Sequence, residues 1–354
     1  MSGLRDILTT RIAAQGPLTV AEYMAECLLH PTHGYYATRD PLGAAGDFTT
    51  APEISQMFGE MLGLSLAQAW LDQGAPSPFT LAECGPGRGT LMADLLRATR
   101  AVPGFHAAAQ VHLIEASPTL REVQRNTLAR DGVIWLDSIQ DLPAQPLFLL
   151  ANEFFDALPV RQFQRDGDGW RERCIGLQDG GLALGLTDRQ QAPQLAHRLD
   201  DTRDGDLVET CAAGANAAGV IGGQIATHGG AALIVDYGDW RSLGDTLQAV
   251  RGHAVADPLA DPGDADLTAH VDFEALAQAA APAAHTRLTP QGVFLERLGI
   301  TARAQALAKG LNGTALETHI AAHRRLTHPR EMGTLFKVLG LYPEGASPPP
   351  GLEP

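Results

Sequence analysis

Short apolar runs alternate with helix-like periodicity along most of the chain. The runs are bounded by Gly, Pro, Asn or Asp, which is typical of buried strands. We expect strands at residues 79–84, 111–115, 133–136, 146–151 and 231–237, and helices at 90–100 and 118–130. This repetition of strand, turn and helix predicts an α/β fold with a mostly parallel sheet and right-handed crossovers.

The residues before this repetition predict helices and one long loop. Apolar positions within residues 4–12 predict a first helix, and Thr19 with Glu22 three residues later forms the signature of a capping box. Residues 35–52 are rich in glycine and small side chains and predict an ordered loop. Apolar periodicity then resumes at residues 54–70 and predicts a further helix.

Three parts follow from these patterns. Residues 1–75 are expected to form a helical N-terminal cap, and residues 76–340 a sheet core with insertions at about 160–230 and 240–300. Within the first insertion, residues 163–178 and 181–186 predict additional antiparallel strands. Residues 341–354 are rich in proline and predict a flexible tail.

The chain is strongly acidic. Its 354 residues include 41 Asp and Glu against 26 Lys and Arg, which gives a formal net charge of −15. Binding duplex nucleic acid requires a basic face, so this charge argues against nucleic acid and permits a cationic substrate. Residues 141–274 concentrate the acidity, with 22 acidic and 9 basic side chains. Most of these carboxylates are interpreted as solvated surface, although such a cluster also attracts basic partners.

Cysteine usage and hydropathy indicate the compartment. The four cysteines form no CxxC pair, so we expect neither a disulfide framework nor a metal site. No apolar run reaches 18 residues, so membrane insertion is not expected. We therefore predict a cytoplasmic enzyme.

The most specific local signal is residues 83–90, ECGPGRGT, between a predicted strand and a predicted helix. Glycines let the backbone turn tightly and approach a ligand closely. A dinucleotide-binding fingerprint would need its third glycine at position 90, which is Thr. The pattern E-x-G-x-G-x-G instead resembles the first motif of class I S-adenosylmethionine (SAM) methyltransferases. That resemblance assigns cofactor binding to Glu83, Gly85, Gly87 and Gly89.

Carboxylates follow the next two predicted strands. Glu115 closes the second strand, where a carboxylate can accept hydrogen bonds from both ribose hydroxyls. Asp137 lies just beyond the third strand, either near the adenine or as a turn residue. Both are candidate cofactor-binding residues.

The fourth strand runs into residues 151–159, ANEFFDALP. Ligands in open α/β sheets bind outside the carboxyl ends of the strands, so Asn152, Glu153 and Asp156 are site candidates. A helix N-cap is the alternative reading of Asn152. Phe154 and Phe155 are interpreted as packing residues.

Several segments together resemble the MidA-like family of SAM-dependent methyltransferases, which includes a mitochondrial complex I assembly protein that methylates arginine. The matching segments are residues 33–36 (HGYY), 46–56 (GDFTTAPEISQ), 83–90, 152–159, 234–238 (IVDYG), 266–273 (DLTAHVDF), 291–295 (QGVFL) and 332–339 (MGTLFKVL). They run in order over residues 17–340. The resemblance implies a Rossmann-like class I fold, and the absence of an import signature favours a bacterial member.

The resemblance also assigns site residues. It implies that a cap loop covers the cofactor through Gly46, Asp47, Phe48 and Thr49. It further implies that residues 264–273 line the acceptor side. The candidates on that side are Asp272 as a second catalytic carboxylate, and Asp236, Tyr237 and His270 as substrate-binding residues. A structural role is the alternative for His270.

These observations predict a SAM-dependent protein arginine methyltransferase that releases S-adenosyl-L-homocysteine. Its client would be a subunit of the respiratory complex I type, and a homodimer is left open. Guanidinium is delocalised and poorly nucleophilic, so Glu153 with Asp156 or Asp272 would hold it and localise its charge. The alternatives are a SAM-binding assembly factor that mainly docks its client, and an NAD-dependent dehydrogenase, which Thr90 disfavours.

Overall fold

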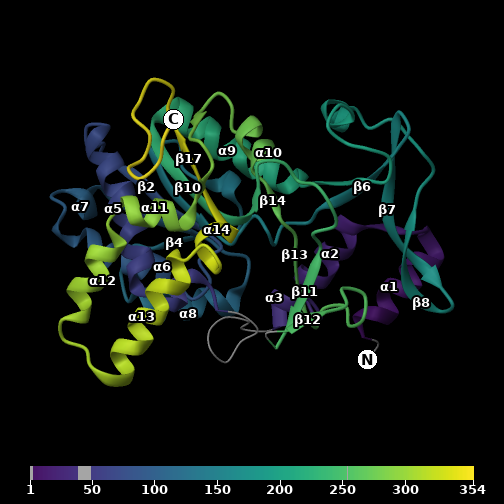
Figure 1. Cartoon of the computed structure of the whole chain (residues 1–354), viewed down its shortest axis with the longest axis horizontal. Coiled ribbons are helices and arrows are strands. Elements are labelled where there is room, and N and C mark those ends of the chain that lie inside the picture. The colour runs from purple at the N-terminus through teal and green to yellow at the C-terminus, as the bar shows by residue number, and fades with distance from the viewer. Residues whose placement is uncertain (1–2, 39–48, 253) are drawn as a thin grey trace. The chain divides into compact units, whose positions relative to one another are not determined.

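The computed structural model describes residues 3–38, 49–252 and 254–354, which fold into two compact units (Figure 1). The small unit combines Met1–Phe48, Asp156–Gly214 and Arg241–Asp272. The sheet unit combines Thr49–Phe155, Ala215–Trp240 and Phe273–Pro354. The first division between the two units along the chain falls at residue 48.

A mixed sheet forms the centre of the sheet unit, with strand order β15–β17–β10–β5–β2–β3–β4. The strands from β10 to β4 run parallel, whereas β17 runs antiparallel to β10. Strand bounds are β2 Phe79–Cys84, β3 Ala109–Ile114, β4 Ile134–Leu136, β5 Leu147–Asn152, β10 Gly230–Asp239, β15 Ala284–His285, β16 Thr289–Pro290 and β17 Phe336–Tyr342. The predicted α/β fold is confirmed, and the antiparallel β17 was not predicted.

Both faces of this sheet are covered. Every residue of β2 and β5 is buried, as expected for parallel strands between layers of helices. Helix α5 (Gln56–Asp72) packs closely on α6 (Thr90–Ala98) through Gly63, where an added Cβ would lie 2.8 Å from Leu95 Cγ. Phe79 meets Phe148 edge to face at a centroid distance of 5.2 Å in the core beneath.

The helices of the sheet unit follow the predicted pattern with one correction. The helix expected at residues 54–70 is α5, which begins at Gln56 because Ser55 is extended and caps it by accepting a hydrogen bond from Met57 N; the short helix α4 before it was not predicted. Helix bounds are α4 Ala51–Ile54, α5 Gln56–Asp72, α6 Thr90–Ala98, α7 Phe105–Ala108, α8 Pro118–Leu128, α9 Ala212–His228 (largely in this unit), α10 Phe273–Ala279, α11 Gln291–Arg297, α12 Ile300–Ala308, α13 Gly313–Thr327 and α14 Met332–Leu335.

The small unit contains two antiparallel sheets, with strand orders β1–β7–β6–β9 (β8 also pairs with β7) and β12–β11–β13. Its helices are α1 Leu4–Gln15, α2 Val20–Leu29 and α3 Tyr35–Thr38, and the capping box at Thr19 and Glu22 is confirmed. Its strands are β1 Leu18–Thr19, β6 Arg161–Asp166, β7 Gly169–Gln178, β8 Gly181–Leu186, β9 Leu207–Thr210, β11 Gln248–Arg251, β12 Ala254–Ala256 and β13 Asp266–Thr268. The strand expected over residues 163–178 is the hairpin β6–β7.

The expectation of a flexible tail at residues 341–354 is wrong. Leu352 is buried, and Pro350 O accepts a hydrogen bond from Ser65 Oγ at 2.8 Å. Glu353 accepts a backbone hydrogen bond from Arg287 N and pairs with Arg297 at 2.7 Å. Proline content misled the prediction, because the segment satisfies its carbonyl groups with donors from distant parts of the chain.

Candidate functional site

A glycine turn joins β2 to α6 at the carboxyl end of the sheet. Gly85, Gly87 and Gly89 have φ of +59°, +53° and +81°, a region that favours glycine. Gly89 N donates to Pro86 O at 2.7 Å and closes the turn. The turn lies where strand order reverses, since β2 is flanked by β3 on one side and β5 on the other. Such a switch point opens a crevice for ligands.

Glu83 lies at the end of β2 and is 2% exposed. Burial, with a smaller contribution from the neighbouring Glu115 carboxylate, raises the pKa of Glu83 to about 8, although the Met92 backbone opposes the shift. Glu83 Oε2 has no hydrogen-bond partner among the residues that the structure describes. A buried carboxylate with an unsatisfied oxygen is suited to a cationic ligand group.

Glu115 directly follows β3 and is 8% exposed. Its Oε1 accepts a hydrogen bond from Ser117 N at 2.8 Å, and its Oε2 accepts one from Gln124 Nε2 at 3.1 Å. Burial raises the pKa of Glu115, and both of these donors act in the opposite direction. Glu115 is thus a buried acceptor at the switch point, and sequence reasoning missed Gln124.

Asp137 lies beyond β4 and its side chain is 87% exposed. Arg121 Nη2 binds the Asp137 carboxylate at 2.5 Å and also donates to Leu136 O at 3.2 Å. Arg121 Nε donates to Glu115 O at 2.8 Å. Arg121 therefore links the ends of β3 and β4, a role that sequence reasoning did not predict.

Asn152 and Glu153 lie at the carboxyl end of β5, next to the glycine turn. Glu153 has φ of +50°, and such left-handed non-glycine residues cost on the order of 1–3 kcal/mol unless their surroundings hold them. Its Oε1 accepts from Asn152 Nδ2 at 3.2 Å and from Ala51 N at 3.3 Å. The next residue, Phe154, would lie 3.1 Å from a Cβ added at Gly85, so the two strand ends are close together.

Asp236, near the end of β10, is fully buried. Its Oδ2 accepts from Phe155 N at 3.0 Å, and its Oδ1 accepts from Tyr237 N at 2.9 Å. Asp236 thus holds the backbone that follows Glu153. Tyr237 is half-buried and contacts Phe336 edge to face.

Helix α4 is hydrogen-bonded to the residue that follows the glycine turn. Glu53 Oε1 accepts from Thr90 Oγ1 at 2.5 Å, which gives a physical role to the threonine that replaces a glycine there. Thr49 precedes α4, and its carbonyl accepts from Arg325 Nη2 at 3.4 Å. The predicted cofactor residues Gly46, Asp47 and Phe48 lie outside the described residues.

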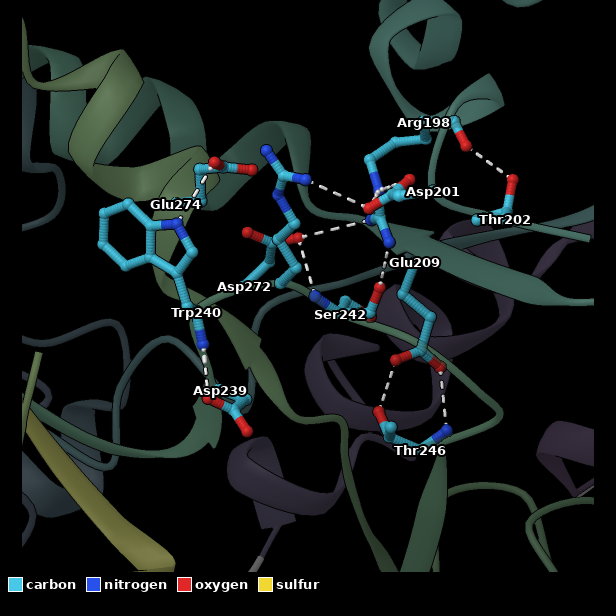
Figure 2. Close-up of polar contacts among 11 residues, drawn as sticks. Arg198, Asp201, Thr202, Glu209, Asp239, Trp240, Ser242, Thr246, Asp272 and Glu274 are labelled. Atoms are coloured by element: carbon cyan, nitrogen blue, oxygen red, sulfur yellow. Dashed lines mark hydrogen bonds and ion pairs between the residues drawn. The ribbon is translucent and has the colours of Figure 1, made fainter.

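The remaining candidates belong to the small unit. Asp272 is bound by Ser242 N at 2.9 Å and by Arg198 Nη1 at 3.9 Å, as Figure 2 shows. Arg198 is 3% exposed and also contacts Asp201 at 3.0 Å. Asp272 is therefore part of an internal ion-pair network.

Asp156 and His270 are held within the same unit. Asp156 is 6% exposed and its carbonyl accepts from Ala269 N at 3.0 Å. His270 N donates to Thr246 Oγ1 at 2.8 Å, and Glu209 in turn binds Thr246 (Figure 2). Glu153, in contrast, is in the sheet unit, so the structure divides the predicted carboxylates between the two units.

The sheet unit brings together the features that could hold a cofactor: the glycine turn, two buried carboxylates and Asn152. Asn152 Oδ1 is also buried and without a hydrogen-bond partner within the described ranges. Across those ranges no cluster of His, Cys, Asp and Glu is arranged to hold a metal, and no helix is long and apolar enough to cross a bilayer.

Comparison with known proteins gives consistent matches. Residues 61–291 match the family described as "Putative S-adenosyl-L-methionine-dependent methyltransferase". The chain is 37% identical to protein arginine methyltransferase NDUFAF7, mitochondrial, of Xenopus laevis, covering 97% of this chain and 85% of that relative. The human protein of that name is 36% identical, with 95% and 82% covered. A Burkholderia thailandensis protein solved with bound S-adenosyl-homocysteine has a TM-score of 0.83 at 30% identity, covering 98% of this chain and 93% of its own.

The expectation of a bacterial cytoplasmic protein is wrong on these comparisons. The Xenopus and human relatives are named as mitochondrial, and so is a Drosophila melanogaster relative that is 35% identical over 95% of this chain and 84% of its own length. A bacterial homologue exists as well, in the Burkholderia structure. Charge and cysteine usage are properties of the folded domain, whereas the compartment depends on targeting signals that do not contribute to the fold. Composition therefore could not predict the compartment.

Proposed function

The chain belongs to the family described as "Putative S-adenosyl-L-methionine-dependent methyltransferase", and from this premise we propose that it methylates an arginine side chain of a partner protein. Relatives named protein arginine methyltransferase support this acceptor, because their similarity extends over nearly the whole chain. The resemblance noted in the sequence implies a client of the respiratory complex I type, and we retain that class.

The geometry of Glu153 carries the proposal. This residue has a strained left-handed backbone at the end of β5, beside the glycine turn that ends β2. Strain of this kind is retained mainly where function requires a side chain in one direction. A carboxylate there can bind a guanidinium group and localise its charge away from the nitrogen that accepts the methyl group.

The residues around the turn fit the proposed cofactor. S-adenosyl-L-methionine supplies an electrophilic methyl group on a sulfonium. We propose that Glu83 and Asn152 bind its amino-acid portion, since each has a buried oxygen without a partner among the described residues. Glu115 would accept the ribose hydroxyls. The protein itself mainly contributes orientation and charge placement.

Positioning roles are proposed for the neighbouring groups. Asp236 would fix the backbone after Glu153 through Phe155 N. Asp156 and Asp272 both remain candidates for the second carboxylate, and Asp272 also pairs with Arg198.

The cofactor cap and the remaining assignments stay predictions. We propose that residues 1–75 act as the cap, with Thr49 in its cofactor-covering loop. Asp137 would lie on the adenine side, and Tyr237 and His270 would contact the substrate. The class I Rossmann-like arrangement with inserted segments is proposed on the same basis.

The decisive experiment labels the acceptor. The protein is incubated with isotopically labelled SAM and cell lysate, and the modified residue is identified by mass spectrometry. We expect label on arginine, and Glu153→Gln should lower the transfer rate by a factor on the order of 10² or more while S-adenosylhomocysteine (SAH) still binds. Exposed Glu122, paired with Arg125 on α8, provides a control variant, Glu122→Gln, that should transfer normally.

Three outcomes would contradict the proposal. If calorimetry detects no heat on addition of either SAM or SAH, the assignment of SAM as the cofactor is wrong. If the label is found only in RNA or small metabolites, the proposal that arginine accepts the methyl group is wrong. If Glu153→Gln abolished transfer but client maturation continued in cells, docking would be the main role instead.

A further inference from the structure

Gln124 makes an unusual set of contacts for a helix residue. It lies on α8, is fully buried, and joins three separate elements through its amide group. Its Nε2 donates to Gly87 O at 2.8 Å and to Glu115 Oε2 at 3.1 Å. Its Oε1 accepts from Trp135 Nε1 at 2.8 Å.

The chemistry of these partners fixes the orientation of the amide. The indole N–H of Trp135 can only donate, so it requires the oxygen of Gln124 on its side. The amide nitrogen must then face Gly87 O and Glu115 Oε2, which both accept. Trp135 is itself held by Arg125, whose guanidinium carbon lies 4.7 Å from the ring centroid. No flipped arrangement of the amide would satisfy all three contacts.

We propose that Gln124 is a positioning residue of the cofactor site, which sets the Glu115 carboxylate and the glycine turn in register with each other. The role rests on the proposed function, in which Glu115 accepts the ribose hydroxyls. Holding Gly87 O against α8 fixes the rotation of the adjoining peptide groups within the turn. Holding Oε2 fixes the plane of the carboxylate, while Ser117 N holds Oε1. The carboxylate is thus oriented before a ligand arrives, which reduces the entropic cost of binding.

Gln124 also compensates for the burial of Glu115. Burial raises the pKa of this carboxyl, and the Ser117 and Gln124 donors lower it. Without Gln124, Glu115 would lose one of the donors that favour its charged form, which accepts hydroxyl hydrogen bonds more strongly. The same substitution would therefore weaken both the orientation and the charge of the ribose acceptor.

The test compares two ligands. Gln124→Met keeps the side-chain length and removes the amide, and exposed Gln140 supplies a control, Gln140→Met. Affinity is measured by calorimetry for SAH and for an analogue lacking the ribose 2′-hydroxyl. Because the variant loses a hydrogen bond to a charged group, we expect SAH affinity to fall about tenfold or more. The affinity for the analogue should fall distinctly less. In a Glu115→Gln background, the Gln124→Met substitution should cause little further loss of SAH affinity.

Trp135→Phe provides a second variant, should Gln124→Met fold poorly. It keeps an aromatic ring and removes the N–H that orients the amide. It should therefore lower the affinity for SAH more than the affinity for the analogue, by a smaller factor than Gln124→Met. Equal losses for both ligands would indicate a merely structural role and overturn the inference, as would unchanged SAH affinity in folded Gln124→Met. A wild-type protein that bound no SAH would overturn the proposed function itself.

Discussion

Replacing Glu83 by Gln tests whether this buried carboxyl is uncharged in the unliganded protein. Its pKa is raised from 4.5 to about 8, mainly by burial. Folding of the unliganded chain therefore takes up a proton at this site. The associated stability is fully present below pH 4.5 and is lost as pH rises towards 8, because the unfolded chain ionises freely whereas the folded one does not.

The size of the effect follows from the shift. One pKa unit corresponds to about 1.4 kcal/mol, so at pH 7 the unfavourable environment of Glu83 costs on the order of 3 kcal/mol of folding free energy. Gln at this position does not ionise. The stability difference between Glu83→Gln and wild type should therefore move in favour of the variant by that amount between pH 4.5 and 7.

Cofactor binding should make the ionised form of Glu83 the favoured one. In the proposed complex the ammonium group of SAH lies at Glu83 and favours its ionised form, so binding should release a proton and affinity should rise with pH until it levels off near pH 8. Urea titrations between pH 4.5 and 8.5 give the stability difference. Calorimetry of SAH in buffers of different ionisation enthalpy counts the protons released. Glu83→Gln should abolish the proton release and flatten the pH dependence of affinity.

Two results would refute the reasoning about Glu83. One is a stability difference from wild type that stays constant between pH 4.5 and 8. The other is SAH binding to wild type without proton release at pH 7. Exposed Glu122 again serves as the control, since Glu122→Gln should leave both quantities unchanged.

Three further substitutions test the surrounding structure. Gly85→Ala should destabilise by about 1–2 kcal/mol from left-handed backbone strain and more from contact with Phe154, and SAH affinity measured by calorimetry should fall with it. Arg198→Met removes a 3% exposed guanidinium together with its contacts to Asp201, Ser242 O and Asp272, and urea unfolding should report a loss of about 3 kcal/mol. Leu352→Ala opens a cavity beneath the C-terminal segment and should cost about 2–4 kcal/mol by the same assay.

Each of these has a matched control. Gly74 shares the positive φ of Gly85 but would bring an added Cβ against nothing within 4 Å, so Gly74→Ala isolates the strain. Arg189→Met removes a 54% exposed arginine and should cost little. Leu64→Ala truncates a leucine that is 42% exposed. Equal effects in a variant and its control would contradict the corresponding explanation.

Local order was readable from the sequence. The strand over residues 79–84 and the capping box at Thr19 were predicted as they occur, because apolar periodicity and capping are properties of neighbouring residues. The glycine turn was predicted for the same reason, since only glycine adopts its positive φ without cost. Family membership also followed from the order of short motifs along the chain.

Contacts between distant residues were decided by the tertiary structure alone. Pairing of Asp272 with Arg198, and the link from Gln124 to Gly87 and Glu115, join positions that have no periodic relation in the sequence. Composition predicted a flexible C-terminal segment, yet its buried Leu352 is part of the hydrophobic core of the sheet unit. Local patterns determine which backbone conformation a segment prefers, whereas the partner of a charge or an amide depends on which segments fold together.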